Sequence, residues 1–139
     1  MRYESFVSAP QLKRDPLGGP EPSLVKTPQE LIGEFAAAVM AQDQCIMRGD
    51  PREGNRHARK YMGAARKLLA GGEAAIEAFC GLLNHPTPGV QAAAAAYLLK
   101  ARTERAVATL RPIAEGRGLS ALGAQMTLAR YERGELEIT

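Results

Sequence analysis

The stretch His85–Arg102, HPTPGVQAAAAAYLLKAR, decides the fold that the sequence predicts. It opens with the turn His85–Gly89, in which two prolines and a glycine prevent a preceding helix from continuing. The alanine-rich helix that follows carries Val90, Ala94 and Leu98 at helical spacing, which gives it an apolar stripe. Because alanine side chains on several faces let neighbouring helices approach closely, we expect this helix to lie at the centre of a helical stack.

The composition is that of an ordinary globular domain. The chain has 139 residues, of which 45% are hydrophobic and 24% charged, and this length suffices for one domain with a hydrophobic core. Aromatic residues make up only 5% and tryptophan is absent, so we expect a core built from Ala, Leu, Ile, Val and Met. No apolar run approaches the about 20 residues of a membrane span, and the N-terminus lacks the apolar segment of a signal peptide. These features predict a cytoplasmic protein without membrane contact, in which Cys45 and Cys80 are reduced thiols.

Residues 1–26 differ from the rest of the chain. Four prolines interrupt them and their apolar residues show no sustained period, so we interpret them as an extended or disordered N-terminal arm. The remainder, residues 27–139, is predicted to form the helical domain. The arm is either a terminus without a partner or an arm that docks on its own domain, on a second copy in a homo-oligomer, or on another protein. Its anchors would be Tyr3, Phe6 and Leu12.

The periodicity predicts about six helices and no strand. The first helix begins with the capping-box pattern of Thr27 and Glu30, and Gly134 ends the last. Short amphipathic helices joined by tight Gly and Pro turns stack as antiparallel pairs, so we predict an all-α, HEAT/armadillo-like helical repeat. Besides the alanine-rich helix, the helices are predicted over residues 28–48, 51–70, 73–84, 104–115 and 120–133.

The same periodicity assigns an inward face to each helix. It places Ile46, Met62, Leu122 and Met126 among the core-facing residues. It also makes Thr103 the cap of the fifth helix. The four apolar side chains are therefore expected to be buried.

The second predicted helix, residues 51–70, carries the strongest local charge in the chain. Six Lys and Arg residues stand against Glu53 alone, a local net charge of +5 in a chain whose total is +3. A solvated helix face would explain this charge. The alternatives are a recognition surface for an acidic partner and, less favoured, one for nucleic acid. The six cations are Arg52, Arg56, Arg59, Lys60, Arg66 and Lys67.

The sequence predicts no enzyme, no metal site and no cofactor. Its Cys and His residues do not occur at metal-ligand spacings, and its glycine pairs lack the strand and the Lys-Ser/Thr of a phosphate-binding loop. Cys80 and His85 could form a nucleophilic pair, but a cysteine on the apolar stripe of a helix is usually a buried thiol with a raised pKa. We expect His85 to stabilise the turn before Pro86, and no catalytic residue is predicted.

The proline turn and the helix after it resemble the second helix of a HEAT repeat. The residues that carry this resemblance are Val90, Gln91, Ala93, Ala94 and Leu98, with Gln91 in place of the usual arginine. Over Pro28–Leu136 the chain also resembles an uncharacterised bacterial family of small HEAT-like all-helical proteins. The elements that carry this second resemblance are Asn55-Arg56, Leu82–Val90 and Gly123–Leu128. The resemblance implies the fold and assigns no catalytic residue.

A helical stack without catalytic residues works through its surface. The sequence therefore predicts a non-enzymatic protein-binding module, and a specific form of it is an immunity or antitoxin-like protein that neutralises a partner toxin. The alternative is a nucleic-acid-binding helical-repeat protein that uses the basic helix 51–70. The candidate interaction surface comprises Asn55, Arg56, Arg59, Lys60, Arg66, Gln91 and Gln125.

Overall fold

The computed structural model describes residues 26–135 of the chain. Within this range all the regular structure is helical, which confirms the predicted all-α fold. The arm predicted over residues 1–26 lies, apart from Lys26, outside the described residues. The helices are α1 (Pro28–Arg48), α2 (Pro51–Ala70), α3 (Glu73–Cys80), the 3-10 helix η3 (Gly81–Asn84), α4 (Pro88–Leu98), α5 (Thr103–Ala114) and α6 (Leu119–Glu132).

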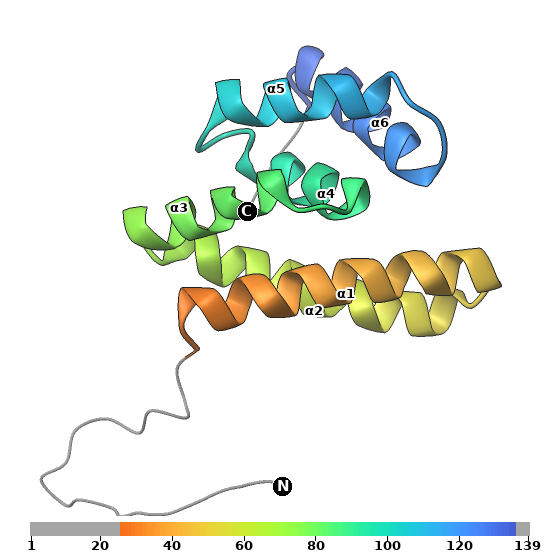
Figure 1. The fold of residues 1–139 in the computed structure, drawn as a ribbon, viewed down its shortest axis with the longest axis horizontal. Helices are drawn as coiled ribbons and strands as arrows, with labels where there is room; N and C mark the ends of the chain where they lie inside the picture. The colour runs from red at the N-terminus through yellow and green to blue at the C-terminus, as the bar shows by residue number, and fades with distance from the viewer. Residues whose placement is uncertain (1–25, 136–139) are drawn as a thin grey trace, which may run out of the picture.

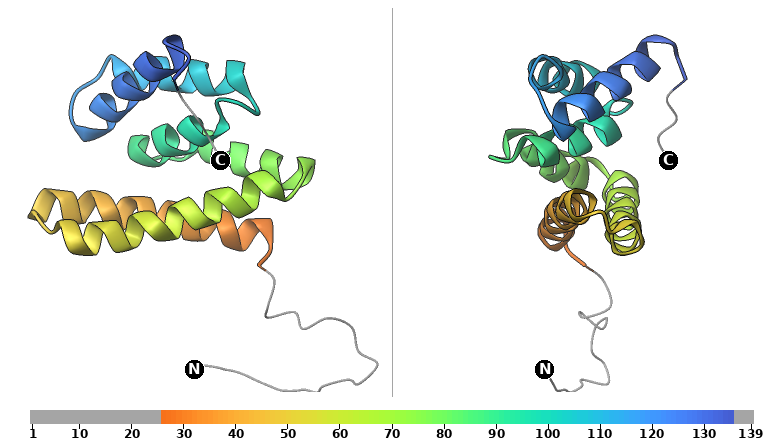
Figure 2. Two further views of the ribbon diagram at one scale, coloured as in Figure 1. Left: turned by 180° about the vertical axis from the view of Figure 1, so that it is seen from behind. Right: turned by 90° about the vertical axis from the view of Figure 1, so that its right-hand side faces the viewer.

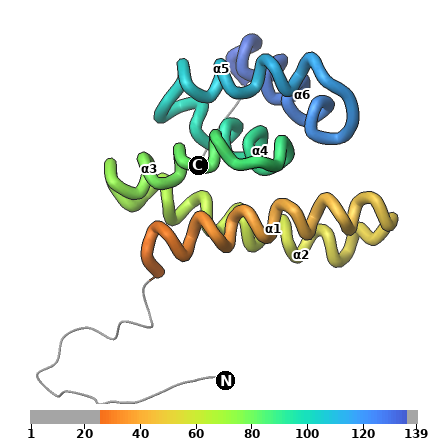
Figure 3. Tube along the Cα trace, viewed as in Figure 1, coloured from red at the N-terminus to blue at the C-terminus, as the bar shows by residue number. Residues whose placement is uncertain are grey.

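The helices form three stacked layers, each made of two helices that follow one another in the chain (Figure 1). Helices α1 and α2 form the lower layer in this view, α3 and α4 the middle layer, and α5 and α6 the upper layer. The end-on view in Figure 2 shows α1 and α2 side by side. The trace in Figure 3 passes back and forth through the layers in chain order. The prediction of helices stacked in pairs is therefore confirmed.

Local signals set the first two helices. The hydroxyl of Thr27 accepts a hydrogen bond from the backbone N–H of Glu30 at 3.1 Å, and the Glu30 carboxylate accepts one from the N–H of Thr27 at 2.8 Å. This is the predicted capping box. Helix α1 ends at Gly49, whose φ of 75° suits a residue without a side chain. Asp50 then caps α2 by accepting from the N–H of Glu53 at 3.3 Å.

Two expectations about helix ends are wrong. The third helix was expected to reach Asn84 as one α-helix, but α3 ends at Cys80 and continues as the 3-10 helix η3. Glycine at position 81 weakens the α-helix, and the tighter turn allows both Leu82 and Leu83 to be buried. Thr103 does not cap α5, because its hydroxyl donates instead to the Leu99 carbonyl at 2.6 Å.

Helix α4 is the centre of the stack, as its alanine-rich sequence predicts. No residue from Val90 to Leu99 is exposed. The helix contacts α1 in the lower layer and both α5 and α6 in the upper layer. Ala94 and Ala95 are completely buried, so the side chains between these helices must be small.

Four aromatic residues form the middle of a core that is otherwise mainly aliphatic. Phe35 of α1 is completely buried. Its ring meets the rings of Tyr61, Phe79 and Tyr97 edge to face, with centroids 5.5, 5.0 and 6.0 Å apart. These three partners lie on α2, α3 and α4, so one ring joins four helices.

Four apolar side chains that the periodicity places in the core are exposed instead. The exposed fractions are 46% for Ile46, 41% for Met62, 52% for Leu122 and 58% for Met126. Helix α6 packs through Ala121, Ala124 and Leu128. Since successive residues of an α-helix are about 100° apart, Leu122 and Met126 lie on the side of α6 that faces away from these three residues.

A surface ion-pair network links α3 to the start of α5. Arg102 contacts the carboxylates of both Glu73 and Glu77, and its Nε lies 3.0 Å from Oε2 of Glu77. Arg105 also approaches Glu77, at 3.3 Å. Hydrogen bonds from Arg102 and then Arg105 hold the pKa of Glu77 below its ordinary value of 4.5.

We expect the stabilisation that Glu77 provides to depend on pH. Because its pKa is lower in the folded chain than in the unfolded chain, the stabilisation is present above about pH 4.5 and is lost as the pH falls through the folded-state pKa. In urea denaturation, Glu77→Gln should therefore lower the midpoint at pH 7 and change it little at pH 3. Glu104→Gln, an exposed position outside the described ion pairs, is the control. An equal loss at both pH values would contradict the prediction.

None of the helices in residues 26–135 combines the length and the apolar character that crossing a lipid bilayer requires.

Candidate interaction surfaces

The first candidate surface is a row of cations on α2, which we call the basic stripe. The stripe occupies an arc of about 120° around the helix, opposite the buried face formed by Ala64, Ala65 and Leu68. In the left panel of Figure 2, α2 lies in front of α1 at the lower edge of the stack. All the members of the stripe are exposed: Arg52, Arg56, Arg59, Lys60, Arg66 and Lys67.

Little negative charge offsets the basic stripe. Glu53, at the start of α2, lies 3.0 Å from Arg56 and 3.8 Å from Nε2 of His57. The other five cations of the stripe form no ion pair with any residue in the range 26–135. The stripe therefore presents positive charge to solvent along most of α2.

The structure brings together five of the seven residues predicted to form an interaction surface. Four of them, Arg56, Arg59, Lys60 and Arg66, belong to the basic stripe, and Asn55 is exposed at its edge. Arg52 and Lys67 lie in the same stripe, although the predicted set omits them. Both are among the six cations counted over residues 51–70, and their place on the same helical arc follows from their spacing.

Gln91 and Gln125 lie on other layers and bond to backbone groups. Gln91, on α4, donates its amide to the carbonyl of His85. Gln125, on α6, donates to the Ala114 carbonyl at 2.8 Å, at the end of α5. Both side chains satisfy carbonyls that a turn or a helix end leaves open.

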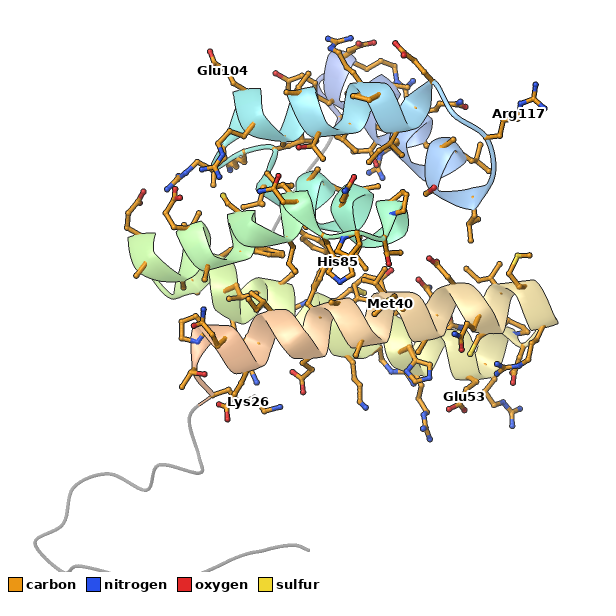
Figure 4. All side chains as sticks on the ribbon, in the orientation of Figure 1. Lys26, Met40, Glu53, His85, Glu104 and Arg117 are labelled. Carbon is orange, nitrogen blue, oxygen red and sulfur yellow. The ribbon has the colours of Figure 1, made fainter. Side chains whose placement is uncertain are left out.

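Cys80 and His85 are the residues considered for nucleophilic chemistry, and their surroundings in the structure suit a structural role. The Cys80 thiol is completely buried, and burial raises its pKa. Nδ1 of His85 accepts a hydrogen bond from the N–H of Thr87 at 3.0 Å, as expected of a residue that stabilises the proline turn. Figure 4 shows His85 near Met40, between the lower and middle layers. Among residues 26–135 no three His, Cys, Asp or Glu side chains are grouped so that they could hold a metal ion.

The second candidate surface is a depression between α1, α4 and α6, which we call the apolar groove. Its volume is about 270 Å³. Helix α4 contributes small residues to its lining: Gly89, Ala92, Ala93 and Ala96. Helices α1 and α6 contribute large apolar side chains that are about half exposed: Ile46, Leu119, Leu122 and Met126.

Asp43 places a carboxylate in the apolar groove. A Cβ atom added to Gly89 would lie 2.7 Å from Oδ2 of Asp43, so glycine permits this close approach. The carboxylate lies at the N-terminal end of α4, where the helix dipole favours negative charge. Partial burial raises the pKa of Asp43. No other residue within 26–135 forms an ion pair with it.

These features define the class of the protein as a small all-helical domain of stacked helix pairs with a basic stripe and an apolar groove. Neither a protein-family model nor a curated protein matches the chain. Among solved structures, the chain is similar to the crystal structure of the protein RPA1889 from the bacterium Rhodopseudomonas palustris, with a TM-score of 0.74 and 24% sequence identity. The match covers 81% of this chain and 94% of that chain. At this identity the likeness concerns the fold alone.

Proposed function

We propose that the chain is a non-enzymatic protein-binding module whose basic stripe binds an acidic surface of a partner protein. The observation that supports this is the row of six exposed cations along one face of α2, of which five have no carboxylate partner within residues 26–135. From Arg52 to Lys67 the stripe extends for about 22 Å, given a rise of about 1.5 Å per residue. A positive field of this extent attracts an acidic partner and orients it during association.

A specific form of the proposal is an immunity or antitoxin-like protein of the bacterial cytoplasm that covers the active site of a toxin. It draws on the resemblance to small HEAT-like bacterial proteins and on the layered packing, which makes α2 a firm support for a binding surface. A toxin that binds nucleic acid needs cations in its own site, and these would repel the basic stripe. The stripe therefore fits better with a toxin whose exposed surface is acidic.

Nucleic acid is the second candidate partner, because the same cations could bind phosphates. The two partners differ in their dependence on salt. Binding to nucleic acid through the stripe should weaken steeply and linearly in a plot of log affinity against log salt concentration. A protein partner with an additional apolar contact should retain part of its affinity at high salt.

The test compares three tagged forms of the full chain as bait in lysate of the host, each with and without nuclease. The forms are the wild type, the double variant Arg59→Glu/Arg66→Glu, and the control Arg117→Glu. Arg117 is exposed in the connection between α5 and α6, away from α2 (Figure 4). We expect one protein to be retained after nuclease and its affinity for the double variant to fall at least about tenfold, or about 1.4 kcal/mol.

Other outcomes reject the proposal. If nuclease removes what the wild type retains, the nucleic-acid candidate is favoured. The control changes the net charge by half as much as the double variant, so if it causes half or more of the loss of binding free energy, the effect is one of total charge and the stripe has no specific role. Circular dichroism of all three forms shows whether the helical fold is retained.

A further inference from the structure

The apolar groove exposes side chains that the sequence pattern assigns to a buried face. Ile46, Leu122 and Met126 fall on predicted inward faces, yet each is about half exposed, and Leu119 adds a fourth. Within residues 26–135, these are four of the seven large apolar side chains that are exposed. Such a concentration of exposed apolar side chains around one depression is typical of an interaction site.

The size of the apolar surface favours a short segment over a second copy of the chain. Four half-exposed side chains amount to on the order of a few hundred Å² of apolar area. A stable dimer buries about 800 Å² on each partner. One or two apolar side chains would be enough to fill a groove of about 270 Å³.

We propose that the N-terminal segment, residues 1–25, docks in the apolar groove, with Leu12 against Leu122 and Met126 and with Lys13 or Arg14 beside Asp43. The sequence QLKR at positions 11–14 places one large apolar residue directly before two cations. The apolar groove has the matching arrangement of apolar side chains and one carboxylate. Residues 1–25 lie outside the described residues, so this placement comes from complementarity of chemistry and from distance.

The length of the segment allows this docking. Lys26 lies at the beginning of α1, and the part of α1 that lines the groove begins at Val39 and ends at Ile46 (Figure 4). These positions are about 17 to 27 Å from Pro28 along the helix, at about 1.5 Å per residue. Leu12 precedes Lys26 by 14 residues, which can span about 46 Å when extended. Because the segment is tethered, its effective concentration at the groove is high and a weak contact suffices.

Methyl NMR on the full chain tests the proposal. In the wild type we expect nuclear Overhauser contacts between the methyl groups of Leu12 and those of Leu122 and Met126. Leu12→Asp should abolish these contacts and shift the Leu122 and Met126 resonances. Leu17→Asp, the same change five residues later, should leave the contacts in place. Both substitutions precede residues 26–135, which contain all the described helices, and the control shows whether a charge in this segment by itself affects the fold.

Asp43→Asn tests the ionic part of the contact. It should reduce the intensity of the Leu12 contacts severalfold and make what remains insensitive to salt. Absence of the contacts in a monomeric wild type would overturn the proposal. So would a dimer in light scattering that persists in Leu12→Asp and dissociates in Met126→Asp, because the groove would then bind a second copy. None of these measurements involves the basic stripe, so they succeed or fail independently of the proposed function.

Discussion

Replacing Phe35 with alanine is expected to lower the free energy of unfolding by about 3–5 kcal/mol. The ring is completely buried, and it contacts aromatic rings on α2, α3 and α4. Alanine would remove the apolar area and leave a cavity among four helices that cannot all move inward together. A loss of this size is a large fraction of the about 5–15 kcal/mol that stabilises an ordinary domain.

Urea denaturation followed by circular dichroism measures the effect of Phe35→Ala. The control is Met47→Ala on the same helix, where the side chain is 81% exposed, and little change is expected. A loss below about 1 kcal/mol for Phe35→Ala, within the range of ordinary substitutions, would show that the aromatic cluster is not the centre of the core.

Enlarging Ala95 to leucine is the second substitution with a large expected effect. Ala95 is completely buried on α4, and no residue of that helix from Val90 onward is exposed. A larger side chain must therefore displace a neighbouring helix or adopt a strained rotamer. We expect a destabilisation of about 1–3 kcal/mol, and more if the layers separate.

Thermal and urea denaturation of Ala95→Leu should be compared with those of Ala37→Leu. Ala37 is exposed on α1, and leucine is nearly as good a helix former as alanine, so the control should be almost neutral. If Ala95→Leu were as stable as the wild type, α4 would have free space beside it and would not be the tightly enclosed centre of the stack.

The boundaries of α1 could be predicted because short local signals set them. The capping box at Thr27 and the glycine at position 49 act within a single turn of α1. The central position of α4 could also be predicted, since the small side chains of an alanine-rich helix let several other helices pack closely against it. In each of these cases the determining residues are neighbours in the sequence.

Contacts between distant residues could not be predicted in this way. Amphipathic periodicity gives each helix an inner face, but the neighbouring helices decide how much of that face is covered. Met126 of α6 stays 58% exposed, and the aromatic cluster joins Phe35 to three rings that come from three other helices. The contacts of Arg102 with Glu73 and Glu77 likewise join positions more than twenty residues apart.

The two candidate surfaces also differ in how far they could be predicted, because one depends on residues of a single helix and the other on contacts between helices. The basic stripe could be predicted because its cations recur on one helix. The apolar groove could not, because it requires three helices to be placed side by side. Gln91 and Gln125 are polar residues of the kind that bind partners, and only the fold shows that backbone carbonyls occupy their amides.

The enclosure of α4 bears on how proteins of this shape can diverge. Substitutions at Ala94 and Ala95 of α4 are restricted to small residues by the helices packed against them, whereas the outer face of α2 has no neighbour in residues 26–135 that restricts its composition. A descendant could thus exchange its cations for acidic or apolar residues without disturbing the layers. Related proteins can therefore keep the helical architecture and still differ in the partner that they bind. A shared fold is then weak evidence for a shared ligand.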